Sequence, residues 1–566
     1  IAHVLAISGL HISLLGMGLY RMLRKRLHTR YVTAALATTV FLISYAVLSG
    51  NGVSTQRAVG MCLIYLFADV TGYAYDMLNA LGIVVLVLLW ENPFLLSYSG
   101  FVFSVMAVIA IGVGANVLLE WEHSWKRRQQ AGEETIKKTF FSRQKEGILV
   151  SFAIQLFTIP LVAYSYYEIP VYAMLINLFV LAVVNGLLGL TVLGVIVGMA
   201  FLPAGRVLFA PCGWMLDSYR FLCEVSLKIP GAQRITGKPA HLRIFWYYLG
   251  LGVFLLAIYA CARRNEKHKD CRETADLCVS RRKKRLQGIV FSCFIAFLLL
   301  FLLFPQKKSF EIDFLDVGQG DGIYLCTGGG TSMFIDGGST DVKQVGKYRI
   351  LPFLKAKGVS EISYWFVSHT DTDHVSGLKE VLVSGYRVEY LVFAKAVEKE
   401  AKTKELAELA RSHGTKVFYM QAGDTVRSKR AAMRCLYPKA SDKAEDVNDL
   451  CLVLQFEEGD IRALFGGDIS TDVEEQLSRR EKWDKVLIFK ADHHGSRYAN
   501  AEALLKCIRP EITVASAGKD NRYGHPSPDA VQRIKESGSR FFCTIEGGRI
   551  RVRVIENKLV CETYVK

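Results

Sequence analysis

Long apolar runs are missing from one half of this 566-residue chain. Up to about residue 304 the sequence has repeated apolar stretches of the length that crosses a bilayer, about 20 residues each. After Pro305 no such stretch occurs. A typical size of about 150 residues per domain also argues against a single core. We therefore expect a polytopic α-helical membrane domain at 1–304 and a second domain of another type at 305–566.

The sequence also lacks the cysteine motifs and the phosphate-binding motif that would indicate simpler functions. Its 13 Cys residues form no CxxC pair and no zinc-finger spacing. Most lie in apolar strand-like or helix-like runs, where a free Cys behaves as a small hydrophobic residue. No G-x-x-x-x-G-K-[ST] motif is present, so any ATP-driven step must come from a partner or another source.

The second domain contributes little to the net charge of +16, because residues 305–566 hold 40 Lys and Arg against 38 Asp and Glu. Most of the positive excess lies between apolar segments, in the stretches 21–30, 121–147 and 262–286. Such clusters typically mark cytoplasmic loops of membrane proteins. Basic patches can bind phosphates, but topology explains these, so net charge is poor evidence for nucleic-acid binding.

The apolar segments predict about ten membrane passes. They lie at 3–20, 31–49, 57–75, 78–98, 100–119, 148–167, 171–187, 188–203, 244–262 and 287–304. The continuous run 171–203 could be one long helix, two passes or a broken pair of half-helices. Two passes are favoured, because an even number must lie between two cytoplasmic loops. The last pass then places the C-terminal domain outside the cytoplasm.

Residues 205–241 are predicted to lie on the same outer side. They are amphipathic rather than spanning, with apolar positions at helical spacing. The simple interpretation is a helix packed on the bundle or lying in the membrane interface. Guidance of a substrate to a pore is the alternative.

Polar residues within the apolar segments are candidates for function, since they are costly in a bilayer. These are His3, His11, Gln56, Arg57, Asn177 and Asn185. Arg57 stands at a segment end, where snorkelling to the interface explains it equally well. His3 and His11 fall on roughly the same helix face, and structural hydrogen bonding is the favoured role for them.

From residue 310 the pattern changes to short β-rich runs that end in polar loops, which suggests a sheet that displays ligands along one edge. The segment 368–374, Ser-His-Thr-Asp-Thr-Asp-His, holds four potential metal ligands: His369, Asp371, Asp373 and His374. An acidic capping loop before a helix at 375–384 is the alternative. Two further strand ends supply Asp468 after a Gly-Gly turn, and His493 with His494.

Together these residues predict a site for two divalent ions with mixed imidazole and carboxylate ligands. Asp468 is suited to bridge the two ions. Paired ions about 3.5–4 Å apart lower the pKa of a bridging water and hold the attacking and leaving oxygens of a displacement at phosphorus. The sequence therefore predicts hydrolysis of an ester or phosphodiester.

The motifs HxDxDH, GGD and HHGS, in this order, resemble the metallo-β-lactamase superfamily. A more particular set resembles the C-terminal domain of the ComEC family of DNA-internalisation competence proteins: LDVGQGDG at 315–322, FIDGG at 334–338, SHTDTDHVSGL at 368–378, ADHHGSRYAN at 491–500 and NRYGHPSPD at 521–529. The membrane half is similar to the competence domain of that family in HVLAISGLHISLL at 3–15, STQRAVGM at 54–61, the segment 79–105 and PGAQR at 230–234.

The resemblance implies an α/β domain of αββα sandwich type behind a channel in the bacterial plasma membrane. In natural transformation such a channel passes single-stranded DNA inward, while an attached metal-dependent nuclease degrades the other strand. It further implies contact with the lipid bilayer, a DNA receptor, and a cytoplasmic ATP-driven motor or single-strand-binding proteins. An N-terminal portion with an OB-like domain is expected to precede residue 1.

The resemblance also implies roles for individual residues. The implied metal ligands are His369, Asp371, Asp373, His374, Asp468 and one or both of His493 and His494. Asp336 would orient the site from behind the ligands. Asp373 and His525 are the candidate catalytic residues: His525 would contact substrate phosphate or protonate the leaving oxygen, unless it is an ordinary loop histidine.

Two departures from the wider superfamily bear on the metal. Asp371 stands where many members have a second His, and no isolated strand-end His lies between His374 and Asp468, since His413 looks like a loop residue. Asn448 is expected to occupy that position. Oxygen-rich ligation admits manganese beside zinc.

A groove for DNA needs basic and aromatic residues near the metal loops. The candidates are Arg497, Tyr498, Lys519, Arg522 and Tyr523, with ordinary solvated loops as the alternative. A rival function is a membrane-anchored hydrolase of a small phosphodiester or ester, although about ten passes far exceed what anchoring requires. Another is a transporter whose inactive hydrolase domain only binds DNA.

Overall fold

The computed structural model describes residues 9–129, 140–267, 276–304, 308–444, 446–556 and 558–565. Parts of two predicted basic loops, 130–139 and 268–275, lie outside these ranges. The chain forms two compact units, Ile1–Phe304 and Pro305–Lys566. Each unit has hydrophobic clusters of its own, so each is described by itself.

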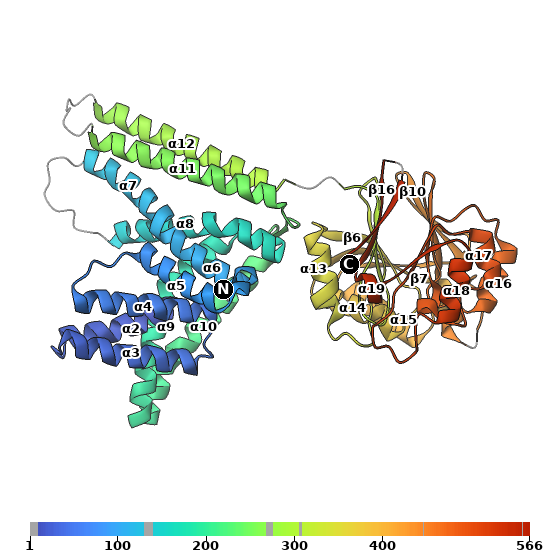
Figure 1. The fold of residues 1–566 in the computed structure, drawn as a ribbon, viewed down its shortest axis with the longest axis horizontal. Helices are drawn as coiled ribbons and strands as arrows, with labels where there is room; N and C mark the ends of the chain where they lie inside the picture. The colour runs from blue at the N-terminus through green and yellow to red at the C-terminus, as the bar shows by residue number, and fades with distance from the viewer. Residues whose placement is uncertain are drawn as a thin grey trace. The chain divides into compact units, whose positions relative to one another are not determined.

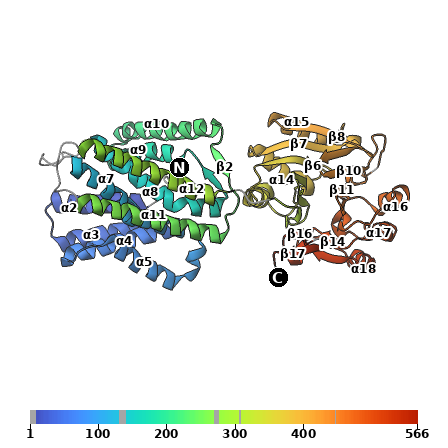
Figure 2. The same ribbon diagram turned by 90° about the horizontal axis from the view of Figure 1, so that it is seen from above.

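The first unit is helical (Figure 1). Its helices are α2 (Gly9–Lys25), α3 (Tyr31–Leu48), α4 (Val53–Thr71), α5 (Met77–Glu91), α6 (Ser99–Ile109), α7 (Asn116–Gln129), α8 (Phe140–Tyr166), α9 (Ala173–Ala200), α10 (Leu202–Lys228), α11 (His241–Lys267) and α12 (Asp276–Leu302). A π-helical turn at Ala110–Ala115 joins α6 to α7. Figure 2 shows α11 and α12 side by side.

Five helices in the described chain are long and apolar enough to cross a bilayer, about half the predicted number. They are Tyr31–Leu48, Ser99–Ser124, Lys145–Tyr166, His241–Arg264 and Arg282–Leu302. Two shorter apolar helices are Met77–Glu91 and Gly186–Ala200. The difference arises because some predicted passes are short, like α5, or carry charged side chains, like α4 with Arg57 and Asp69. The five helices support a membrane location.

The prediction that 171–203 makes two passes is wrong, because α9 continues without a break from Ala173 to Ala200. The amphipathic stretch forms α10, which packs along α9. Their start and end are tied by a ribbon of two short strands, since β1 (Glu168–Pro170) pairs with β2 (Gln233–Ile235). The two helices therefore run out and back.

Pro160 inside α8 shows how the helices satisfy one another's backbone. A proline has no N–H, so the carbonyl four residues earlier, that of Leu156, loses its helical partner. The Tyr247 hydroxyl of α11 donates to Leu156 O at 2.9 Å, and Tyr248 donates to Phe157 O at 2.8 Å. Buried backbone groups need such partners where no water reaches them.

The second unit contains two sheets. The eight-stranded sheet has the order β17-β16-β3-β4-β5-β6-β7-β8, and the seven-stranded sheet has the order β15-β14-β13-β12-β11-β10-β9. The strands of the first are β3 (Glu311–Phe314), β4 (Gly322–Cys326), β5 (Ser332–Asp336), β6 (Glu361–Phe366), β7 (Arg387–Ala394), β8 (Lys416–Met420), β16 (Ile550–Ile555) and β17 (Lys558–Thr563). Those of the second are β9 (Thr425–Ser428), β10 (Ala431–Tyr437), β11 (Val453–Glu458), β12 (Ile461–Phe465), β13 (Ile488–Lys490), β14 (Ile512–Ala515) and β15 (Arg540–Cys543).

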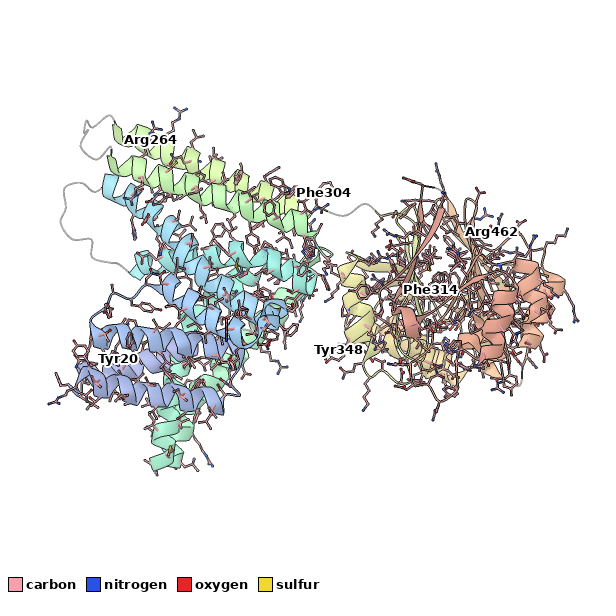
Figure 3. All side chains as sticks on the ribbon, in the orientation of Figure 1. Tyr20, Arg264, Phe304, Phe314, Tyr348 and Arg462 are labelled. Atoms are coloured by element: carbon pink, nitrogen blue, oxygen red, sulfur yellow. The ribbon has the colours of Figure 1, made fainter. Side chains whose placement is uncertain are left out.

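Helices cover the outer face of each sheet, so this unit is an αββα sandwich. One apolar cluster lies between the sheets and includes Phe314, which Figure 3 labels among the strands. A second packs the first sheet on α13 (Leu351–Ala356), α14 (Thr372–Val383) and α15 (Ala401–Ser412). A third packs the other sheet against α16 (Thr471–Arg480), α17 (Glu502–Ile508) and α18 (Pro528–Glu536).

Parallel strands in both sheets bring the functional loops together. Strands β5 to β8 are parallel neighbours, and so are β12 to β15. The carboxyl ends of parallel strands share one edge of their sheet, where ligands of α/β proteins commonly bind. The candidate residues follow β5, β6, β12 and β13 at these ends.

Candidate metal centre

Asp468 is the central residue of a buried cluster of histidines and carboxylates. Its Oδ2 atom lies 3.3 Å from His374 Nε2 and 3.4 Å from His494 Nε2. Asp468 follows β12 of one sheet, while His374 belongs to the first turn of α14, after β6 of the other. All three side chains are at least nine-tenths buried. The two sheets thus meet at one shared carboxylate.

Each of these histidines is oriented from behind by a second oxygen. His374 Nδ1 lies 3.0 Å from Asp336 Oδ2. His494 Nδ1 lies 3.0 Å from the carbonyl of Ser516 and 3.6 Å from Asp321 Oδ1. Oxygen partners at Nδ1 fix the ring orientation and leave Nε2 facing the site, the arrangement found around metal-binding histidines. Asp336 therefore lies behind His374, and its orienting role stays a prediction.

The electrostatics of the metal-free cluster favour charged side chains. Burial lowers the pKa of His374, but the carboxylates of Asp468 and Asp336 outweigh it and raise that pKa well above its ordinary value. The pKa of His494 is raised in the same way by Asp468 and Asp321. Burial raises the pKa of Asp468, yet the two histidines hold it well below its usual range. Both imidazoles thus hold protons that a cation would have to displace.

The donor set fits divalent cations. His374 Nε2, His494 Nε2 and Asp468 Oδ1 are buried and make no hydrogen bond. Two groups have ligand atoms within 4.8 Å of one another: Asp321, His374, Asp468 and His494, and separately His369, Asp373 and His374. Orphaned buried polar atoms are costly unless a partner completes them. Imidazole and carboxylate donors suit zinc or manganese.

Glycines of two motifs let the neighbouring loops approach α14 closely. A Cβ at Gly320 would lie 2.4 Å from Asp373 O, and one at Gly338 would lie 2.5 Å from His374 N. The backbone N–H of Asp321 donates to Asp373 O at 3.1 Å. Any larger residue would push the first turn of α14 away from the cluster. This is the physical reason for glycine at these places in GQGDG and FIDGG.

Three residues at the centre have left-handed backbone conformations, namely Asp336 (φ 58°), His493 (φ 49°) and His494 (φ 55°). Such conformations cost on the order of 1–3 kcal/mol each and collect at functional sites. At His494 the strained turn directs the side chain inward, where it is 1% exposed. The folded state is therefore less stable by this cost, and in return the side chains of these residues are held at the centre.

The structure brings together only some of the predicted ligands. His369, Asp373, His374, Asp468 and His494 gather as described. His493 is partly exposed, with Nε2 3.9 Å from Asp468 Oδ2. Asp371 is half-exposed and pairs instead with Lys402 Nζ at 2.8 Å, while its Oδ2 is 4.0 Å from His369 Nε2.

Asn448 is not part of the cluster. Its buried Oδ1 has no hydrogen-bond partner, and none of its contacts within the described chain reaches a cluster residue. The same segment supplies Cys451 instead, whose Sγ lies 3.4 Å from His369 Nδ1 and 3.5 Å from the backbone nitrogen of Asp468. Burial raises the pKa of this thiol well above its ordinary value, so the group is neutral near pH 7. The position expected of Asn448 is corrected accordingly.

His525, which is half-buried, lies beside the cluster together with the exposed substrate candidates Arg522 and Tyr523. The His525 ring lies 5.5 Å from that of His493 and stacks on Tyr523 at 5.7 Å. Arg522 lies over Tyr523 at 5.2 Å. Burial and the neighbouring histidines lower the pKa of His525 to about 4, so this imidazole is neutral near pH 7.

The other three substrate candidates lie on the neighbouring surface. Arg497, Tyr498 and Lys519 are exposed, and no contact joins their side chains to the cluster within the described residues. Tyr498 is 71% exposed and so is open to stacking. Arg497, Tyr498 and Lys519 follow β13 and β14, the strands whose ends carry the cluster.

Four buried titratable residues near the cluster were not predicted from the sequence: Asp321, Glu474, Lys490 and Asp492. Lys490 at the end of β13 pairs with Asp321 Oδ2 at 2.7 Å, and both side chains are 1% exposed. Behind them Asp492 and Glu474 face each other, both fully buried. Asp321 stands in the GQGDG motif, and a lysine that ends an apolar strand was the available signal for a buried pair.

Of the membrane candidates, His3 and the side chain of His11 lie outside the described residues. Gln56 is half-buried. Arg57 is 7% exposed inside the bundle, so it does not snorkel to an interface. Its Nε donates to Ser104 Oγ at 2.6 Å.

Comparison with known proteins adds a family to this geometry. Residues 1–260 match the competence protein family. The competence match covers the helical unit up to α11, so it is independent of the cluster above.

Two curated relatives extend over nearly the whole chain. ComE operon protein 3 of Bacillus subtilis (strain 168) is 25% identical over 98% of the chain and 68% of its own length. Recombination protein 2 of Haemophilus influenzae is 24% identical over 99% of the chain and 69% of its own length. Among solved structures, the metallo-β-lactamase fold protein YhfI from Bacillus subtilis aligns with 43% of this chain and 100% of its own, at 11% identity and a TM-score of 0.31.

Proposed function

We propose that this chain takes up DNA through its helical unit and cuts a DNA strand with its C-terminal unit. The observation that carries the proposal is the carboxylate of Asp468 shared by two buried, oxygen-backed histidines, in a chain whose residues 1–260 match the competence protein family. The relatives named for competence and recombination support a role in DNA uptake. The five long apolar helices support a location in the bacterial plasma membrane.

In this proposal His369, His374, His494, Asp373 and Asp468 hold two divalent ions, manganese or zinc. When bound, the ions supply positive charge to a phosphoryl group and make a water molecule more acidic. The pKa of Asp373 is raised by burial but lowered overall by its two histidine neighbours, so its carboxylate stays anionic and offers an oxygen donor to a cation. Asp371 joins the ligands only if its pair with Lys402 opens.

His525 and Tyr523 hold the substrate in the proposed reaction. A neutral imidazole still donates one N–H, so hydrogen bonding to a phosphate oxygen is the role we assign to His525. Protonation of a leaving oxygen would require its pKa to rise from about 4. Tyr523 is 53% exposed and offers a face on which a base can stack.

The decisive experiment measures hydrolysis by residues 305–566 with manganese or zinc, on single-stranded DNA, double-stranded DNA and bis(p-nitrophenyl) phosphate. We expect metal-dependent DNA cleavage that falls at least 100-fold in Asp468→Asn, since Asp468 lies beside both buried histidines that would hold the ions. Asp520→Asn, on an exposed loop nearby, is the matched control. Cleavage of the small ester without DNA cleavage would support an anchored phosphodiesterase instead.

A further inference from the structure

The helical unit buries a positive charge that no carboxylate neutralises. Arg57 in α4 is 7% exposed, and no ion pair joins it to any residue of the described chain. A cation inside a membrane bundle is costly, and such residues mark substrate or ion pathways when they persist. Arg57 therefore needs an explanation other than surface snorkelling.

The hydrogen bonds of Arg57 within the described chain use only some of its N–H donors. A guanidinium carries five N–H groups. Arg57 Nε donates to Ser104 Oγ of α6 at 2.6 Å, and Nη1 donates to Met61 Sδ at 3.2 Å. No described residue accepts from Nη2. A Cβ placed on Gly9 would lie 2.9 Å from that Nη2, so the glycine at the start of α2 leaves space beside it.

The surroundings add positive charge rather than negative charge. Arg57 lies about one turn after the start of α4 at Val53, and Ser104 lies within two turns of the start of α6 at Ser99. Helix N-termini carry a partial positive charge and favour anions. A buried cation near two such termini is electrostatically incomplete until an anion joins it.

The helix directions place this group at one end of the unit. Helix α2 ends at Lys25 in the basic stretch 21–30, and α7 ends at Gln129 in the basic stretch 121–147. Arg57 packs near the opposite ends of these elements, beside Gly9 and Ser104. Since the basic stretches are the predicted cytoplasmic ends, Arg57 belongs to the predicted outer end.

We infer that Arg57 binds a phosphodiester group of the incoming DNA strand at this end of the helical unit. The choice of DNA rests on the proposed function. Guanidinium groups recognise phosphate oxygens with two parallel hydrogen bonds. The N–H groups of Nη2 and the remaining N–H of Nη1 can supply them. A phospholipid headgroup has the same chemistry, but Arg57 is turned into the bundle and not toward its periphery.

The test measures binding of fluorescent (dT)20 to the full chain in dodecyl maltoside, with Asp373→Asn to prevent cleavage. We expect Arg57→Gln to weaken binding roughly tenfold, because a charged hydrogen bond is lost. It should also reduce the slope of log affinity against log salt by about 0.7, the value for one phosphate contact on a single strand. Arg57→Lys should restore the slope. Arg220→Gln, on the exposed face of α10, should change neither quantity.

The salt slope separates binding from a structural role. An unchanged slope in folded Arg57→Gln, judged by its elution volume and melting temperature, would overturn the inference. Unchanged DNA binding together with loss of one co-purified phospholipid in native mass spectrometry would assign the site to lipid. If the parent chain cuts DNA and the Arg57→Gln variant binds (dT)20 with the same affinity and salt slope as the parent, only this inference fails. If the parent chain neither binds nor cuts DNA, the proposed function fails with it.

Discussion

Replacing Lys490 by methionine tests whether the loop before Asp321 is held by a buried charge pair. Lys490 Nζ lies 2.7 Å from Asp321 Oδ2 and donates to Ala491 O at 2.9 Å. Burial lowers the pKa of Lys490, but Asp321 and Asp468 outweigh it, so the ammonium stays charged at neutral pH. Methionine has a similar length and no charge. The variant therefore leaves the Asp321 carboxylate buried with His494 as its remaining partner.

The expected loss of stability follows from that geometry. Removing one partner of a buried ion pair costs about 3–5 kcal/mol. His494 holds a proton and lies 3.6 Å from Asp321 Oδ1, so it offsets part of the loss and places the expected value near 3 kcal/mol. A domain of this size loses about 2–4 °C in melting temperature for each kcal/mol. We expect a decrease of roughly 6–12 °C.

The assay is thermal and urea unfolding of residues 305–566, followed by fluorescence of the buried Trp365. The control is Lys485→Met, since Lys485 is half-exposed and 3.9 Å from Glu511, and exposed pairs contribute at most about 1 kcal/mol. The double variant with Asp321→Asn should cost less than the sum of the two single changes. A loss below about 1 kcal/mol in Lys490→Met would refute the reasoning.

Three further predictions concern the same unit. Binding of manganese or zinc at pH 7 should release protons, because His374 and His494 have raised pKa values and must lose their protons to bind a cation. Calorimetry in buffers of different ionisation enthalpy measures the number of protons released. Binding without proton release would contradict these pKa shifts. The free energy of unfolding should fall as pH rises above about 4.5, because the raised pKa of Glu474 lets the folded state hold more protons than the unfolded state. Glu474→Gln should flatten this fall in urea titrations. If the variant and the parent lose stability with pH at the same slope, the pair of Glu474 with Asp492 is not the source of the fall. Tyr523→Leu should weaken single-stranded DNA binding about 5- to 100-fold while Tyr523→Phe retains it, since stacking contributes about 1–3 kcal/mol per base.

Much of the candidate centre could be predicted because its residues stand at strand ends. A β-rich run followed by His or Asp predicts a ligand at the sheet edge, and the parallel pairing of β12 with β13 brings Asp468 and His494 together. His374 joins them from the other sheet, through the packing of the two sheets. The Lys490–Asp321 pair could not be predicted, because its partners are 169 positions apart and meet only through the packing of two sheets. The pair of Asp371 with Lys402 could not be predicted for a similar reason, since Lys402 approaches it from α15.

In the helical unit, apolar length alone could not define the passes. The run 171–203 has no polar break that would distinguish one 28-residue helix from two shorter ones. The decisive fact is the pairing of β1 with β2, which joins residues about 65 positions apart and shows that α10 returns beside α9. The composition of the individual segments does not indicate such a pairing.

The carboxylate of Asp468 belongs to one sheet, whereas His374 is attached to the other through β6 and α14. Ions held between them would act as cross-links between the two halves of the sandwich. Binding to the folded state alone adds stability in proportion to the logarithm of free metal. A chelator would then do more than stop hydrolysis: it would loosen the seam between the sheets and let the two layers shift against each other.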